Sequence, residues 1–168
     1  MSISALLLPE YDQEIAITRR VLERVPDDRG EWRPHPKSFP MAHLAQLVAR
    51  IPAWVPMVMR ETELDIAPTT GAKFPGYTIE KTATLLAELD RNAAAGRAAI
   101  AAAGDADFDV PWTLKAAGRP IVTQSRYLTL RATVINHLVH HRAQLGVYLR
   151  LVDVPVPSMY GPTADEKV

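Results

Sequence analysis

The chain has 168 residues, the length of one ordinary domain, and its 19 Lys and Arg balance its 19 Asp and Glu, so the formal net charge is zero. It has five histidines and no cysteine, which excludes a disulfide framework, a thiolate metal site, an iron–sulfur cluster and a cysteine nucleophile. The zero net charge and the dispersed basic residues also argue against a nucleic-acid partner.

The first eight residues are apolar but lack the basic region of a signal peptide, and Pro9 follows them directly. No stretch approaches the roughly 20 consecutive apolar residues that a membrane-spanning helix needs. We therefore expect a soluble, cytoplasmic protein without a membrane partner. The first helix is expected over residues 10–24, where apolar residues recur at helical spacing, and it ends before Pro26.

Prolines mark the next boundaries. A second helix is expected over residues 40–61, with Pro40 in its first turn, where proline is tolerated. Pro52 and Pro56 lie inside this segment and predict a kink. The Ala-rich window 77–103 is free of proline and predicts a third helix.

Residues 110–122 follow a different pattern. Trp112 to Leu114 faces Ile121 and Val122 across a segment containing glycine and proline, which predicts a short β-hairpin. The last helix is expected over residues 123–152, before Pro155. The sequence thus predicts a single all-α domain over residues 1–168, a four-helix bundle with a small β-hairpin between the third and fourth helices.

His137 and His141 are the main candidates for chemistry. At 100° per residue they share one face of the fourth helix and lie within its apolar stripe. Two histidines four residues apart can chelate one cation. Burial of two unpartnered imidazoles is unfavourable, and a shared metal would satisfy both. The alternative is a pair of core histidines that hydrogen bond to other side chains or to water.

A third ligand should come from a facing helix. His43 lies at the edge of the apolar stripe of the second helix, whereas His35 lies between two prolines and belongs to a loop. We therefore predict a three-histidine metal site made of His43, His137 and His141. Three neutral ligands leave coordination positions open for water or substrate, which is typical of a catalytic site.

Four segments carry a resemblance to a known family: WRPHPKS at 32–38, HLA at 43–45, NHLVHHRAQL at 136–145 and PVPSMYGPTADE at 155–166. Over nearly its whole length the sequence resembles the DinB/YfiT-like superfamily of metalloenzymes. The resemblance implies a four-helix bundle with up-down-down-up topology, a frequent homodimer, and one divalent metal ion, zinc or nickel, held by three histidines. Two of these match His137 and His141, and the third comes from the second helix.

One position departs from the family pattern. Relatives carry the second-helix histidine seven residues before the Trp of a Pro-x-Trp motif, which here is Trp54. Leu47 stands at that position, and His43 lies one helical turn earlier. Either the site uses His43, or it has lost one ligand; we favour His43.

A second apolar set on the fourth helix lies away from the histidine face and comprises Leu128, Ile135, Val139, Val147 and Leu151. A helix that is apolar on more than one side is buried on more than one side. This set predicts either further packing within the bundle or a homodimer interface.

Two functions are compatible with these features. The first is a metal-dependent enzyme, either a hydrolase or a thiol-dependent transferase, because a metal lowers the pKa of a bound water or thiol. Since the chain has no cysteine, the thiol would arrive with a small-molecule substrate, as a low-molecular-weight thiol or its conjugate. The second is a non-catalytic, stress-related binding protein that keeps the bundle but has a degenerate metal site.

Overall fold

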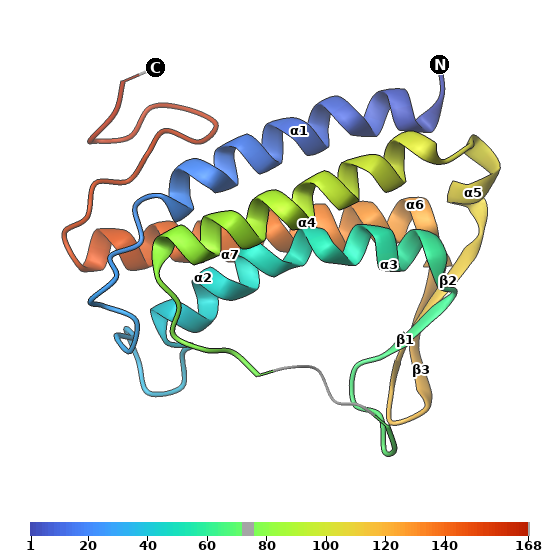
Figure 1. The fold of residues 1–168 in the computed structure, drawn as a ribbon, viewed down its shortest axis with the longest axis horizontal. Coiled ribbons are helices and arrows are strands. Elements are labelled where there is room, and N and C mark those ends of the chain that lie inside the picture. The colour runs from blue at the N-terminus through green and yellow to red at the C-terminus, as the bar shows by residue number, and fades with distance from the viewer. Residues whose placement is uncertain (72–75, 168) are drawn as a thin grey trace.

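Four long helical segments pack side by side in the computed structural model, which describes residues 1–71 and 76–167 (Figure 1). They are α1 (Ile3–Leu22); α2 (Met41–Arg50), the 3-10 turn η1 (Ile51–Ala53) and α3 (Trp54–Arg60); α4 (Thr82–Ala102); and α6 (Arg126–Thr129), the π-helical segment η2 (Leu130–Ile135) and α7 (Asn136–Leu151). In Figure 1, α1 and α7 run toward the left, and α2, α3 and α4 run toward the right. The fold is mostly helical, as the sequence predicted, with a small sheet at one end.

The first helix begins earlier than the sequence indicated. It starts at Ile3 rather than residue 10, because the Ser2 side chain caps it by accepting a hydrogen bond from the Ala5 N–H at 3.2 Å. The Ile3 N–H donates to the carboxylate of Asp105 at 2.8 Å, which satisfies a further free donor of the first turn. The helix continues through Pro9, so the expected start after this proline was wrong.

The second helical segment is interrupted where its prolines predicted a kink. The 3-10 turn η1 contains Pro52, which has no N–H to donate to the preceding turn. Helix α3 then resumes the direction of α2 (Figure 1). The interruption lies between Leu47 on α2 and Trp54, the first residue of α3.

The third helix begins later than expected, at Thr82 rather than residue 77. Asp27, from the loop after α1, accepts a hydrogen bond from the Thr82 N–H at 2.7 Å and so caps the helix from a distant part of the chain. The residues just before the helix are bound to α2 instead, where the Thr78 N–H donates to the Gln46 side chain at 2.9 Å. The helix start is therefore set by tertiary contacts.

The expected hairpin is present and belongs to a three-stranded mixed sheet. Strands β2 (Pro111–Ala116) and β3 (Arg119–Ser125) are antiparallel, with Leu114 opposite Val122. A strand that the sequence did not indicate, β1 (Glu63–Asp65), pairs with β2 in parallel. Because β3 extends to Ser125, the last helix starts at Arg126 and not at residue 123. The short helix α5 (Asp105–Asp109) links α4 to the sheet.

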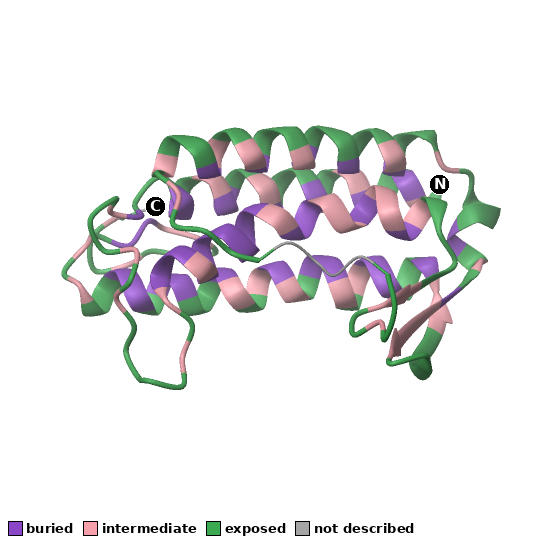
Figure 2. Cartoon of the chain, turned by 60° about the horizontal axis from the view of Figure 1, so that its bottom comes forward, coloured by how far each residue is buried: buried purple, intermediate pink, exposed green. Residues whose placement is uncertain are grey.

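Buried residues lie mostly on the faces that the helices turn toward one another, and exposed residues cover the outer faces (Figure 2). Of the second apolar set on the last helix, Ile135 is in the core. Leu128, Val147 and Leu151 are exposed, so this set does not act as one packed face within the chain. Among the described helices, none is long and apolar enough to cross a membrane.

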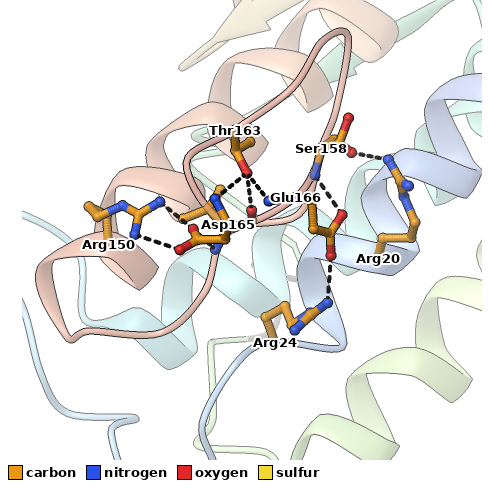
Figure 3. A network of polar contacts seen from close by, with 8 residues as sticks. Arg20, Arg24, Arg150, Ser158, Thr163, Asp165 and Glu166 are labelled. Carbon is orange, nitrogen blue, oxygen red and sulfur yellow. Dashed lines mark hydrogen bonds and ion pairs between the residues drawn. The ribbon is translucent and has the colours of Figure 1, made fainter. Parts of the chain in front are cut away.

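The C-terminal segment after α7 folds back against the ends of α1 and α7 (Figure 3). Glu166 pairs with Arg24 at 2.7 Å and accepts a hydrogen bond from the Ser158 N–H at 2.9 Å. Asp165 pairs with Arg150 of α7 and accepts from the Val156 N–H at 2.9 Å. These contacts hold the tail against both helices.

Candidate functional site

His137 and His141 meet as the sequence predicted. They lie one turn apart on α7, and their Nε2 atoms are 2.7 Å from each other. Both side chains are partly buried. The ring of Trp54, from α3, lies against His137 with the ring centroids 5.2 Å apart.

One partner favours a particular tautomer of His141. Its Nδ1 lies 2.8 Å from Oε1 of Gln144, an oxygen that can only accept a hydrogen bond, so this nitrogen carries the proton and the Nε2 lone pair faces His137. At His137, the backbone of Thr133 raises the pKa of the ring and so opposes part of the larger lowering by burial.

Burial keeps this pair neutral. Desolvation is the largest cause that lowers the pKa of His137, and the neighbouring His141 lowers it further. Desolvation likewise lowers the pKa of His141, partly opposed by its hydrogen bond to Gln144. At neutral pH both rings are therefore neutral imidazoles, which is the form that binds a metal ion.

His43, the predicted third ligand, lies on α2, and its pKa is affected by His141. Its ring is stacked between Phe39 and Tyr77, with centroid distances of 4.1 and 3.7 Å. Burial lowers its pKa, and the nearby His141 lowers it as well. The two aromatic rings cover both faces of the imidazole. A ligand can therefore approach His43 only at the edge of the ring, where its nitrogens lie.

Within residues 1–71 and 76–167, no group of three His, Asp or Glu side chains is close enough to hold a metal ion. The structure thus joins His137 to His141, and the three-histidine site that includes His43 stays a prediction. His35 lies apart, in a loop, where it accepts a hydrogen bond from the Lys37 N–H. His140 is exposed, but its ring packs edge-on against His141 with the centroids 4.9 Å apart, and its Nε2 lies 3.1 Å from Nε2 of Gln144.

A largely apolar cavity of about 410 Å³ adjoins His137. Its walls come from α2, α3, the π-helical segment and the sheet: Leu47, Arg50, Trp54, Met57, Val58, Leu64, Ile66, Tyr77, Trp112, Leu114, Thr133, Val134 and His137. Leu47, which stands at the family's histidine position, is thus part of an apolar wall. The cation in this wall, Arg50, is neutralised by Glu88 at 2.8 Å and lies over the ring of Tyr77.

A second, more open cavity of about 370 Å³ adjoins His141. It is lined by Lys37, Ser38, Phe39, His141, Gln144, Val147 and Tyr148. Tyr148 donates to the Phe39 carbonyl oxygen at 3.2 Å and packs edge-on against Trp32, so this tyrosine is part of the core.

Sequence reasoning missed several residues that shape the site. Phe39 and Tyr77 orient His43, and Thr133 orients His137. Gln144 was recognisable, because it lies three residues after His141 on the same helix and can reach its ring. Tyr77 carried no such signal, because it reaches His43 from a loop that only the folded chain places there.

Comparisons with known proteins agree with the fold. The fold is similar to that of a DinB-like protein from Bacillus cereus, with a TM-score of 0.68 and 21% identity, covering 95% of this chain and 98% of that chain. A DinB-like protein from Bacillus subtilis has a TM-score of 0.68 and 14% identity, covering 92% and 97%. No curated protein matches the sequence. The family model of the DinB superfamily matches residues 10–145, and the chain therefore belongs to the DinB superfamily.

Proposed function

We propose that this protein binds one divalent metal ion, zinc or nickel, at His137 and His141, with His43 as the third ligand. The observation that carries the proposal is the 2.7 Å approach of the two Nε2 atoms, with Nδ1 of His141 held by Gln144. Two ring nitrogens on successive turns of one helix are close enough here to ligate one cation. Burial lowers the pKa of both rings, so the pair is neutral at pH 7 and able to bind a metal ion.

His43 is the third ligand in this proposal because of its surroundings. Phe39 and Tyr77 cover both faces of its ring, and it makes no hydrogen bond to another described residue. A half-buried imidazole without a polar partner is unfavourable unless it has a ligand. Leu47 contributes no donor atom, so the site uses the turn of α2 that carries His43.

The function we propose is that of a metal-dependent enzyme acting on a small molecule, either a hydrolase or a thiol-dependent transferase. When bound, the metal would lower the pKa of a water or of a substrate thiol. The chain's own residues bind and orient: Gln144 holds the His141 imidazole in the tautomer that presents Nε2. The apolar walls around Trp54 exclude water from the His137 side.

Metal analysis of protein purified without a histidine tag tests the proposal. We expect about one metal ion per chain, lost in His137→Ala and in His141→Ala and strongly reduced in His43→Ala. His35→Ala is the matched control, because His35 lies in a loop away from the pair, and it should keep the metal. Wild-type protein holding less than about one tenth of a metal ion per chain, with no uptake of added zinc or nickel, would overturn the proposal.

The alternative function is a stress-related binding protein that is not catalytic and has a degenerate site. Two observations favour it: the leucine at position 47 and the lack of a close trio of ligands among the described residues. The two functions differ in His43→Ala. If the site is degenerate, this substitution leaves metal binding unchanged, because only His137 and His141 hold the ion.

We also propose a homodimer located in the cytoplasm. Val147 and Leu151 lie one turn apart on α7 and are 59% and 56% exposed, which is unusual for large apolar side chains that lie side by side on a helix. Light scattering should give twice the chain mass of 18.6 kDa. Val147→Glu with Leu151→Glu should give the monomer, and a monomeric wild type at micromolar concentration would contradict the proposal.

A further inference from the structure

The three histidines lie between the two cavities. His137 lines the apolar cavity and His141 lines the open one, and their Nε2 atoms are 2.7 Å apart. His43 also lies between the two cavities. One of its faces stacks on Tyr77, which lines the apolar cavity, and the other stacks on Phe39, which lines the open cavity. A molecule that reaches the histidines from both sides must therefore occupy two different environments.

The cavity on the His137 side suits an uncharged, apolar group. Leucine, valine, methionine and tryptophan side chains make up most of its wall, and no carboxylate lies among its described lining residues. The charge of Arg50 is already neutralised by Glu88. A volume of about 410 Å³ falls within the range of small-molecule sites, about 300–1,000 Å³.

The cavity on the His141 side has a different character. It is wide, and it combines one cation, Lys37, with the polar side chains of Ser38 and Gln144. Within the described part of the chain, Lys37 has no carboxylate within salt-bridge distance. An uncompensated ammonium beside two polar side chains favours an anionic group.

We propose that the ligand of this protein is an amphipathic organic anion. Its apolar part fills the cavity on the His137 side, its anionic part lies beside Lys37 on the His141 side, and the bond between the two parts passes the histidines. The position of the reacting bond rests on the proposed function, because it places that bond next to the metal ligands. The division of the ligand into an apolar and an anionic part rests on the two cavities alone.

Straight-chain carboxylates are suitable probes, since they carry one anionic group on an apolar chain of adjustable length. Hexanoate, octanoate and decanoate should bind the full-length protein, measured by isothermal titration calorimetry without added metal. Each added methylene should tighten binding by up to about fourfold while the cavity has room. Decyltrimethylammonium, with the same chain and the opposite charge, should bind at least tenfold more weakly than decanoate.

Two substitutions separate the parts of the site. Leu114→Trp on β2 fills the apolar cavity from a half-buried position and should weaken the binding of decanoate at least tenfold. If circular dichroism shows that this variant does not fold, Met57→Trp fills the same cavity from α3. Lys37→Glu should weaken decanoate at least tenfold. Lys81→Glu makes the same charge change at an exposed position that lines neither cavity, and should leave the affinity unchanged.

The inference is overturned if decanoate does not bind at millimolar concentration, if binding is unaffected by both filling variants, or if decyltrimethylammonium binds as tightly as decanoate. These outcomes are independent of metal uptake. A protein that binds decanoate in the expected pattern but takes up no metal refutes only the proposed metal site. A protein that takes up metal but fails these tests refutes only the two-part ligand.

Discussion

Arg142 and Glu14 form an ion pair inside the bundle, with Nη2 of the arginine 2.6 Å from the carboxylate and the side chains only 1% and 8% exposed. Arg142 also donates to the backbone carbonyl of Glu14 and to the hydroxyl of Thr18 on α1. Tyr160 of the tail hydrogen bonds to both members of the pair. Because Arg142 follows His141 directly, the same turn of α7 that presents the histidine is fixed to α1 and to the tail.

Removal of the arginine should therefore be strongly destabilising. Arg142→Met would leave the Glu14 carboxylate buried without its cation, and we expect a loss of about 3–5 kcal/mol in the free energy of unfolding, measured with urea. Arg150→Met breaks the exposed pair with Asp165 and should cost only about 0–1 kcal/mol. Equal losses in the two variants would contradict the structural importance of the buried pair.

Gly96 on α4 allows close packing against α1 and η1. A methyl group at this position would meet the hydroxyl of Tyr11, and it would lie 3.1 Å from the carbonyl oxygen of Pro52. We expect Gly96→Ala to lower the free energy of unfolding by about 1–3 kcal/mol, although alanine is the better helix former. Gly146→Ala on α7 is the control, because its methyl would meet only the flexible end of Met159 and a valine. It should be neutral or stabilising.

Metal affinity should fall on acidification. The pKa of each histidine of the pair is lowered, chiefly by burial, so both rings are neutral at pH 7 and bind without losing a proton. Below their pKa values protons compete with the metal, and the apparent affinity decreases. Competition with a chelating dye should give a zinc affinity that weakens as the pH is lowered from 7.5 in steps. A constant affinity down to the pH at which the protein unfolds would exclude the histidine pair as ligands.

The tail should loosen in acid. The pKa of Asp165 is lowered by its hydrogen bond to Arg150 and by the Val156 N–H. A lowered pKa in the folded state means that the carboxylate stabilises the fold above the ordinary pKa of 3.8, and that this stabilisation is lost as the pH falls through the lower folded value. Asp165→Asn should lower the melting temperature at pH 7, with a smaller difference at pH 3. Asp109→Asn, at an exposed position, should change little at either pH.

The parts of this structure that local sequence patterns specify were predictable. The pairing of His137 with His141 follows from their spacing of four residues, and the hairpin follows from two β-rich runs around Gly118, which has a positive φ of 76°. The interruption of the second helix follows from Pro52, because it has no N–H. Each of these features is determined within about ten residues of the chain.

The remaining features depend on contacts between distant segments. Strand β1 has three residues, and it forms only because β2, about fifty residues later, offers a free edge. The α4 start depends on Asp27, and the setting of His43 depends on Tyr77 from the loop before α4. The π-helical segment carries no proline or glycine signal. The sequence could therefore place each histidine on its helix but could not describe the surroundings of the site.

The π-helical segment Leu130–Ile135 lies between the hairpin and the histidines, and the Asn136 N–H donates to the carbonyl of Arg131, five residues back. Such a segment accommodates one residue more than an α-helix would, so it rotates the helix before it by about 100° relative to the helix after it. The π-helical segment thus lets two faces of this helix be aligned independently. One is the face on which Arg126 and Thr129 are buried, and the other carries His137 and His141. Loss of a single residue here would rotate the sheet around the helix axis while the histidines kept their place. The shape of the apolar cavity can therefore diverge between relatives without any change in the turn that carries the two histidines.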